Sequence, residues 1–552
     1  MRHPAFLRGG VLILALSELA AGGCGRGGAG DAREARIREA NAAGILLFGN
    51  GAEVSDLDPQ VVTGVPEHKV LMALFEGLVS ETPGTLEPEP AVAERWDVSE
   101  DGRTYTFHLR ADARWTSGEP VTASDFVRSY QRILTPSLAA EYANMIYDFV
   151  EGAKDYYDGR ETDFAKVGFR ALDARTLEVR LKHPTPFFLR LVASHYAWYP
   201  VPISVVERFD GIARKGSAST RPENFVGNGP FRLKAWLRQQ KIVVERNPDY
   251  WDAARVRLNE IHFFNTENIT VEERMFRTGQ LHRTYEIPHQ KIETYRQARS
   301  PHLHTDPYLG SYFYRVNVTR APFNDVRVRR AFALAVNRED LVNHVTRGGQ
   351  QPAYNYTPPG FPDYHPKAHI TGTLEDARRL LAEAGYPEGR GLPAVEIHFN
   401  TSENHQAIAE AIQAMWRRNL GVEVTLKNQE WKVYLDAHDT LDYSVSRSGW
   451  IADYLDCNTF LEIFVTGGGN NDTGWSNAEY DALRQRALAA PTNAERIACY
   501  ERMEEILMEE LPIIPLYFYT RPHLLDTTVK GMIANPLDNH PFKYVWLEQP
   551  AP

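Results

Sequence analysis

The sequence predicts a mixed α/β protein with several domains. Its 552 residues suffice for three or four domains at roughly 100–200 residues each. Short segments with the two-residue apolar alternation of strands follow segments with the spacing of amphipathic helices. The composition, 43% hydrophobic and 24% charged, is near the average of globular proteins, which excludes disorder, coiled coil and collagen as descriptions of the whole chain.

The first residues have the composition of a secretory signal, predicted over 1–23. Two arginines precede the apolar run 11–16, and small residues lead to Cys24. That run is shorter than the ~20 residues that span a bilayer, and no later stretch reaches this length. Cys24 resembles the acylated cysteine of a bacterial lipobox, although the aliphatic Leu19 stands five positions before it rather than three. We expect a lipid anchor on Cys24 and a linker over 24–41; the alternative is a secreted protein with an unmodified cysteine.

The elements predicted in the first half begin with 31–44, which is either a short helix or a disordered spacer. Apolar residues alternate with polar ones over 105–109 and again over 177–181, as in half-buried strands. Thr122 and Asp125 have the spacing of a capping box. A helix is therefore expected to begin there.

The second half predicts a β-α-β unit. Apolar residues at helical spacing indicate helices over about 374–384, before Gly385, and over about 405–419. The segments 395–399 and 422–426 flank the second of these helices and read as strands. A helix that connects two such strands is typical of a parallel crossover.

Several classes of function are excluded or left without support. The net charge of −11 lacks the basic footprint of a nucleic-acid-binding protein. The sequence contains no GxSxG, HExxH, CxxC or GxxxxGK motif. The histidine pairs 302/304 and 365/369 lie beside prolines without other ligands nearby. We therefore expect no enzyme activity, no metal and no cofactor, and we interpret the glycine-rich segment 467–472 as a flexible connection.

Ordered motifs along the chain resemble those of the bacterial extracellular solute-binding proteins of family 5, in particular the oligopeptide receptors of ABC importers. The likeness spans roughly residues 45–548. It rests on segments 50–59, 64–67, 74–78, 115–126, 228–231, 322–329, 354–359, 428–431 and 449–454.

The resemblance implies a type II clamp of two lobes with an additional α/β domain. Lobe I would be discontinuous, the additional domain would follow its first segment, and hinge crossings would lie near 309–315 and 516–521. Such lobes close on a ligand as rigid bodies. The implied division is 42–75, 203–309 and 521–552 for lobe I, 76–202 for the additional domain and 310–520 for lobe II.

The implied function is a monomeric receptor in the periplasm or on the outer cell surface. It would capture short peptides and deliver them to an ABC permease and its ATPase subunits, without catalysis, cofactor or nucleic acid. A murein-peptide receptor for cell-wall recycling is the alternative within the class. A peptide-sensing receptor and an unrecognised secreted hydrolase are alternatives from other classes.

The resemblance also implies the ligand contacts. Asp453 would bind the ammonium group of the peptide, while Arg447 and His405 would serve its carboxylate. Close approach of the ligand backbone would involve the loop of Thr63, Gly64 and Val65, together with Gly449. The side-chain pockets would be lined by Tyr142, Tyr285, Trp431, Trp450 and Tyr519.

The chain departs from the family pattern at several of these positions. Arg315 and Thr63 replace acidic residues, and His438 replaces an arginine that reads an acidic ligand group in the murein-tripeptide receptor. Thr346 replaces a lysine that serves longer peptides. We therefore expect tripeptides to be favoured and cationic side chains to be disfavoured near Arg315. The cysteine pair of close relatives is replaced by Gly310 and Ile451, and whether Cys457 pairs with Cys499 is left open.

Overall fold

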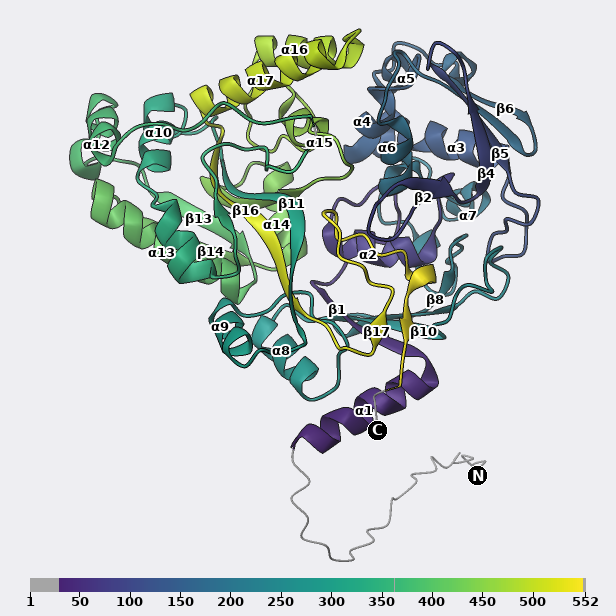
Figure 1. Cartoon of the computed structure of the whole chain (residues 1–552). Coiled ribbons are helices and arrows are strands. Elements are labelled where there is room, and N and C mark those ends of the chain that lie inside the picture. Colours follow the sequence, from purple (N-terminus) through teal and green to yellow (C-terminus); the bar gives the residue numbers. More distant parts are fainter. Residues whose placement is uncertain (1–28, 362, 550–552) are drawn as a thin grey trace, which may run out of the picture.

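The computed structural model describes residues 29–361 and 363–549, which form three parts, each built around a β-sheet (Figure 1). We call these sheets the first, second and third in the order in which the chain enters them. The mixed α/β class predicted from the sequence is confirmed. Residues 1–23 and Cys24, on which the signal and lipid-anchor predictions rest, lie outside the described residues.

The first sheet has the strand order β1-β10-β9-β8, with β1 parallel to β10 and the other neighbours antiparallel. Phe48, Phe263 and Phe542 pack edge to face in the core beside it. The elements of this part are β1 (Ile45–Gly51), α2 (Val65–Leu74), β8 (Phe231–Leu237), β9 (Lys241–Arg246), β10 (Glu260–Asn265), α8 (Ile269–Arg277) and α9 (His289–Gln297).

The segment predicted as a short helix or spacer is a helix, α1 (Ala29–Ala43), that leads into β1 (Figure 1). Ile37 is its buried apolar contact with the protein body. Arg33 forms an ion pair of 2.5 Å with Asp526, and the Asn41 amide donates to the Glu548 carbonyl at 2.6 Å. These contacts hold α1 against the C-terminal segment of the chain.

The second sheet has the order β4-β5-β7-β6 and confirms both strands predicted in the first half. The apolar positions of β5 are buried and the polar positions between them are half-buried, as expected. Helix α3 begins after Thr122, whose hydroxyl accepts the Asp125 N–H in the predicted capping box. The elements are β4 (Ala93–Val98), β5 (Thr104–Leu109), α3 (Ala123–Ile133), β6 (Phe169–Asp173), β7 (Thr176–Arg180) and α6 (Phe188–Ser194).

The third sheet has six strands in the order β12-β16-β11-β15-β13-β14, of which β12 spans only Gln351–Pro352. Strands β13 and β14 are parallel and α13 connects them, which confirms the predicted crossover unit. Helix α12 ends at Glu383, two residues before Gly385, whose φ of +97° suits glycine. The principal elements are β11 (Leu303–Val316), α10 (Val326–Leu334), α12 (Leu374–Glu383), β13 (Val395–Asn400), α13 (Glu403–Leu420), β14 (Val424–Gln429), α14 (Trp431–Asp439), β15 (Val445–Ile451), α16 (Ala478–Ala489), α17 (Asn493–Glu510) and β16 (Ile513–Leu524).

Two long antiparallel strands connect the first and third parts. Strands β11 and β16 run side by side through the centre of the molecule (Figure 1), paired from Leu303–Leu524 to Arg315–Ile513. Their register shifts between Pro307 and Ser311, close to the predicted hinge crossing. The residue bounds of the two lobes and of the additional domain stay predictions.

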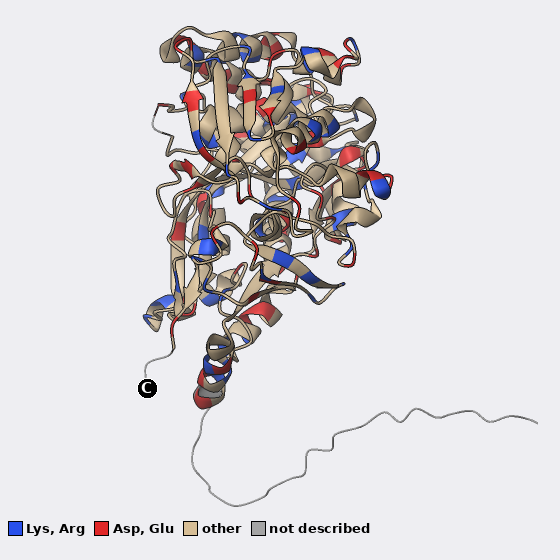
Figure 2. Cartoon of the chain, turned by 90° about the vertical axis from the view of Figure 1, so that its right-hand side faces the viewer, with Lys and Arg blue, Asp and Glu red and all other residues tan. Residues whose placement is uncertain are grey.

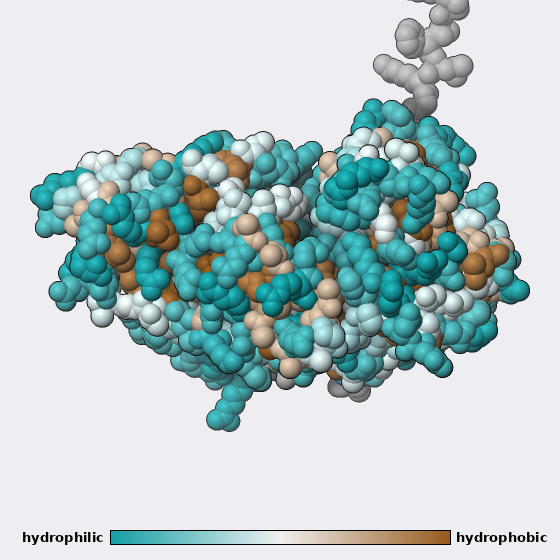
Figure 3. Space-filling model, turned by 90° about the horizontal axis from the view of Figure 1, so that it is seen from above, coloured by the Kyte–Doolittle hydropathy of each residue, from teal (hydrophilic) through white to brown (hydrophobic). Residues whose placement is uncertain are grey.

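The chain carries both signs of charge interspersed along its elements (Figure 2). Seen from above, it is mostly hydrophilic, with apolar residues gathered in small groups (Figure 3). In 29–361 and 363–549, no helix combines the length and the apolar character that crossing a membrane would require.

Candidate ligand-binding site

A cavity of about 250 Å³ lies where the three parts meet, and most of the predicted site residues line it. The loop before α2, the start of α13 and strands β15 and β16 all contribute to its wall. The predicted residues found there are Thr63, Gly64, Val65, Tyr142, Tyr285, His405, Trp431, Arg447, Gly449, Trp450, Asp453 and Tyr519.

The geometry of strand β15 explains why several of these residues share one wall. Side chains two residues apart in a strand lie on the same face. Arg447, Gly449 and Ile451 therefore share a face, and Asp453 lies two residues after the end of the strand. The strand period thus accounts for Arg447 in this wall, and Asp453 reaches the same cavity from just beyond the strand.

Asp453 has no cationic partner among the residues that the structure describes. Thr459 donates to it at 3.3 Å, the Tyr142 hydroxyl donates at 3.5 Å, and His195 Nε2 lies 3.6 Å away. Burial holds the pKa of His195 well below its usual range, so this imidazole is neutral at pH 7. Burial, with a further contribution from Glu462, raises the pKa of Asp453 well above its ordinary value. A ligand cation beside it would favour its ionised form.

Arg447 is the corresponding unpaired cation. Its guanidinium donates to the Tyr519 hydroxyl at 2.9 Å and to Asn400 at 3.2 Å, and it lies over the Tyr312 ring. No carboxylate in the described part of the chain forms an ion pair with it. Arg447 can therefore accept an anionic group that enters the cavity.

His405 supplies a hydrogen-bonding group rather than a charge. It is 7% exposed, and its Nδ1 lies 3.3 Å from the Tyr312 hydroxyl. Burial and the neighbouring Arg447 hold its pKa well below the usual range. The expectation that His405 faces the cavity agrees with its position, but it adds no positive charge for a carboxylate near pH 7.

Aromatic side chains form much of the remaining wall. Tyr142 packs against His195 and Trp450, with ring centroids 4.3 and 6.4 Å apart, and Trp431 stacks on Tyr434. The indole Nε1 atoms of Trp431 and Trp450 are buried donors without a partner in the described chain. Flat apolar faces combined with free donors suit ligands of varied side chain.

The reason for glycine at 449 differs from the one expected. A Cβ at this position would meet the Tyr519 hydroxyl at 2.6 Å. The missing side chain therefore makes room for Tyr519, which in turn bonds Arg447. Gly64 likewise makes room for a protein group, because a Cβ at this position would collide with the Glu67 carboxylate.

Arg315 and His438 do not line the cavity, which corrects the expectation that they face the ligand. Arg315 is 4% exposed, forms an ion pair with Asp472 and donates to the Asn470 carbonyl at 3.0 Å. His438 lies behind the wall, with Nε2 2.7 Å from the Ser446 hydroxyl. The segment read as a flexible connection thus supplies the carboxylate that neutralises Arg315, and the expected repulsion of cationic ligands loses its source.

The structure also shows the surroundings of the other residues that depart from the family pattern. Thr346 is buried beside the cavity and donates to the Gln350 side chain at 2.9 Å; Gln350, not Thr346, reaches the wall. Gly310 and Ile451 are direct cross-strand neighbours. Cys457 and Cys499 are free thiols.

Sequence reasoning missed a contact that closes the cavity. Asn404, at the start of α13, accepts the His289 N–H at 3.1 Å and donates to Glu286 and to the Ile287 carbonyl, both at 3.3 Å. It joins the third part of the molecule to the segment 285–289 of the first part. Its position beside the predicted His405 was the available signal.

Two cavity cations, Lys69 and Arg521, were also missed. Arg521 lies two residues after Tyr519 on β16, so the strand period that places Tyr519 in the wall also predicts Arg521 there. Lys69 is on α2, four residues after Val65. In the described ranges, no group of three or more His, Cys, Asp or Glu side chains is placed to hold a metal ion.

Comparison with known proteins places this cavity in a family. The family model described as bacterial extracellular solute-binding proteins, family 5 Middle, matches residues 87–472. The periplasmic oligopeptide-binding protein OppA of Salmonella typhimurium is 38% identical over 90% of this chain and 91% of its own length. The crystal structure of Haemophilus influenzae OppA in complex with RPPGFSPFR is 34% identical, with a TM-score of 0.86 over 91% of this chain and 98% of that one.

The same comparison identifies the conformation. The Escherichia coli murein tripeptide binding protein MppA superposes with a TM-score of 0.86, whereas its unliganded open form gives 0.61, at the same 34% identity and 91% coverage of this chain. These two structures cover 98% and 97% of their own chains. The arrangement described here is thus unlike the open form and agrees with the contacts of Asn404 across the cavity. The fold, the cavity and the match over most of its length establish that the chain belongs to the bacterial extracellular solute-binding proteins of family 5.

Proposed function

We propose that this protein is the receptor of an ABC importer and captures short oligopeptides by closing around them. The proposal rests on two residues of opposite charge, Asp453 and Arg447. Each lines the cavity and neither has an oppositely charged partner in the described chain. A ligand with an ammonium group and a carboxylate complements both charges, and such pairing offsets the cost of removing them from water.

The comparisons support the peptide as the ligand class. The Salmonella relative is named an oligopeptide-binding protein, and the Haemophilus structure is a complex with RPPGFSPFR. The loop of Thr63, Gly64 and Val65 and strand β15 at Gly449 lie on the cavity wall, where they would meet an extended ligand backbone. Recognition of the backbone and both termini accommodates many side chains.

The proposal includes the clamp and its place in the cell. Lobe I (42–75, 203–309 and 521–552) and lobe II (310–520) would open about β11 and β16, with 76–202 as the additional domain. The receptor would act in the periplasm or on the outer cell surface, held there by a lipid on Cys24, and pass its ligand to a permease driven by ATPase subunits. No chemical step is assigned to it.

Native mass spectrometry of the purified protein, followed by calorimetry with trialanine, tests this function. We expect co-purified peptides and an intact ligand after incubation, because a receptor returns what it binds. N-acetylated trialanine should bind at least a hundredfold more weakly. Cleavage of the peptide would identify a hydrolase, and the absence of binding to any peptide of two to five residues would refute the proposal.

A murein peptide is the second candidate ligand, favoured by the likeness to MppA. The position at which that receptor reads an acidic group is His438 here, and it lies behind the cavity wall. A calorimetric competition titration of trialanine against a murein tripeptide shows which of the two ligands binds more tightly.

A further inference from the structure

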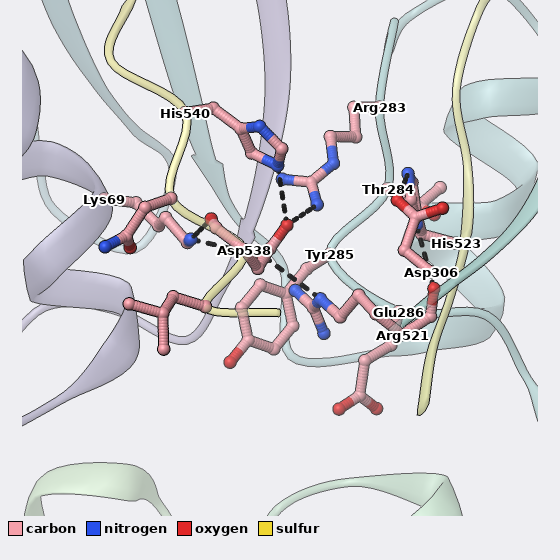
Figure 4. Close-up of polar contacts among 12 residues, drawn as sticks. Lys69, Arg283, Thr284, Tyr285, Glu286, Asp306, Arg521, His523, Asp538 and His540 are labelled. Carbon is pink, nitrogen blue, oxygen red and sulfur yellow. Dashed lines mark hydrogen bonds and ion pairs between the residues drawn. The ribbon is translucent and has the colours of Figure 1, made fainter. Parts of the chain in front are cut away.

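At one end of the cavity, a single carboxylate contacts several cations. The carboxylate of Asp538 contacts three cations: Arg283 at 2.6 Å, Lys69 at 3.2 Å and Arg521 at 3.2 Å (Figure 4). His540 also bonds this carboxylate, at 2.8 Å. Burial lowers the pKa of His540 to about 4, so it adds no charge at pH 7. Asp538 is therefore the one described carboxylate in direct contact with these three cations.

The titration of Lys69 reflects the same imbalance. Burial, opposed by Asp538 and assisted by Arg283 and Arg521, lowers the pKa of Lys69 to about 8. Burial would raise the pKa of Asp538, but the three cations hold it well below its usual range. A second anion near Lys69 would stabilise the charged form of this lysine.

Two of the three cations face the cavity. Lys69 and Arg521 line it, whereas Arg283 lies behind them and is 1% exposed. Arg521 is 6% exposed, and its Nη2 is a buried donor with no partner among the described residues. Its guanidinium lies over the rings of Tyr285 and Tyr308, at 4.5 and 5.5 Å from their centroids. The group is thus held in place with one donor unused.

The neighbouring carboxylates do not form ion pairs with these two cations. Glu286 lines the same wall, but its side chain accepts from Asn404 across the cavity, at 3.3 Å. Asp306 lies 4.0 Å from His523 rather than beside a cation. Neither completes the pairing of Arg521 in the described structure.

We infer that Lys69 and Arg521 form a subsite for an acidic side chain of the ligand. The inference rests on the proposed peptide-binding function and specifies the class of peptide. The unused Nη2 of Arg521 would donate to the ligand carboxylate, with Lys69 contributing a second positive charge. Arg447, on β15, remains available for the terminal carboxylate.

Calorimetry with matched tripeptides tests this subsite. Trialanine is varied by placing Glu at each position in turn, and each peptide is compared with its Gln counterpart, which has the same shape without the charge. In the wild type we expect the Glu peptide to bind about tenfold more tightly than the Gln peptide at one position, because charge-assisted hydrogen bonds are about twice as strong as neutral ones. Lys69→Met should reduce this ratio to about threefold, and Arg521→Gln should reduce it to about one.

The chain offers a matched control in Lys543. It is a buried lysine like Lys69, each 3% exposed, but it pairs with Glu76 away from the cavity. Lys543→Met should leave the ratio unchanged. Circular dichroism melting of each variant identifies one that fails to fold, and if Arg521→Gln does so, Lys69→Met alone decides.

The outcomes separate this subsite from the proposed function. If trialanine binds but no Glu peptide binds more tightly than its Gln partner, or if Lys69→Met leaves the ratio intact, the subsite is refuted while the receptor function stands. If amidation of the C-terminus, rather than Glu-to-Gln replacement, removes the effect of Lys69→Met, the cluster holds the terminal carboxylate and the inference is wrong. If no peptide binds, the proposed function itself fails.

Discussion

Replacement of Asp453 by Asn should weaken peptide binding by two to three decades without unfolding the protein. Loss of one partner from a buried ion pair costs about 3–5 kcal/mol, and each 1.4 kcal/mol is a factor of ten in affinity. The lower end of that range applies, because the Asp453 side chain is 14% exposed. Asparagine can still accept from Thr459 and Tyr142, which hold the carboxylate in place.

The stability of the empty protein provides the control. The folded-state pKa of Asp453 is raised above the ordinary value of 3.8, so the folded state binds more protons than the unfolded state above that pH. Its contribution to the free energy of unfolding is therefore lost as pH rises from about 3.8 to the folded pKa. The Asp453→Asn protein lacks this loss and should melt at pH 7 no lower than the wild type.

Calorimetry with trialanine and its N-acetylated form measures the effect directly. The acetylated peptide should bind the wild type about as weakly as trialanine binds the variant, and the two changes together should not add, because they remove the same ion pair. Binding of trialanine should also release protons in the pH range where Asp453 of the empty protein is protonated, since the ammonium group favours ionised Asp453. Equal affinity for the two peptides, or additive losses, would refute the ammonium contact.

Three further predictions concern closure, anchoring and pH. Asn404→Ala removes three hydrogen bonds that contribute about 0.5–1.5 kcal/mol each. The variant should bind trialanine at least fivefold more weakly, and X-ray scattering should show a larger radius of gyration for its ligand-bound form. An unchanged radius would count against a role of Asn404 in closure. Cys24→Ser should move the protein from the detergent phase to the aqueous phase on phase partitioning, whereas a wild type already in the aqueous phase would exclude the anchor. Glu272 accepts the N–H groups of Tyr285 and Glu286, and burial raises its pKa to about 8. The wild type should therefore lose stability as pH rises from about 4.5 to 8, and the melting temperature of Glu272→Gln should rise relative to that of the wild type over this range. A constant difference between the two melting temperatures would contradict the raised pKa.

Sequence patterns predicted the helices and strands that are determined by residues close together in the chain. The capping box at Thr122 and the crossover around helix α13 depend on residues within a few turns of each other, and both appear as predicted. Helix α13 begins two residues earlier than expected because Ser402 is its N-cap, with the Ser402 hydroxyl accepting the His405 N–H. The ends of helices depend on single capping side chains, which the spacing of apolar residues does not reveal.

The candidate site could be predicted in position but not in charge. Most residues carried over from the family line one cavity, because the backbone that holds them is shared. Charge balance depends instead on pairs far apart in the sequence. Asp472 neutralises Arg315 across 157 residues, and Asp538 gathers cations from positions 69, 283 and 521. No pattern along the chain indicates these partners.

Arg315 and Arg521 show why that distinction matters for specificity. In the sequence, each is an arginine on a strand that approaches the ligand, and each would be expected to repel a cationic peptide. Arg315 has its own carboxylate and lies outside the cavity, so it affects ligand charge little. Arg521 shares one carboxylate with two other cations and keeps a donor free at the cavity wall. A preference for acidic over basic peptides, if measured, therefore has its source at Arg521 and should survive replacement of Arg315 together with Asp472 by a neutral pair.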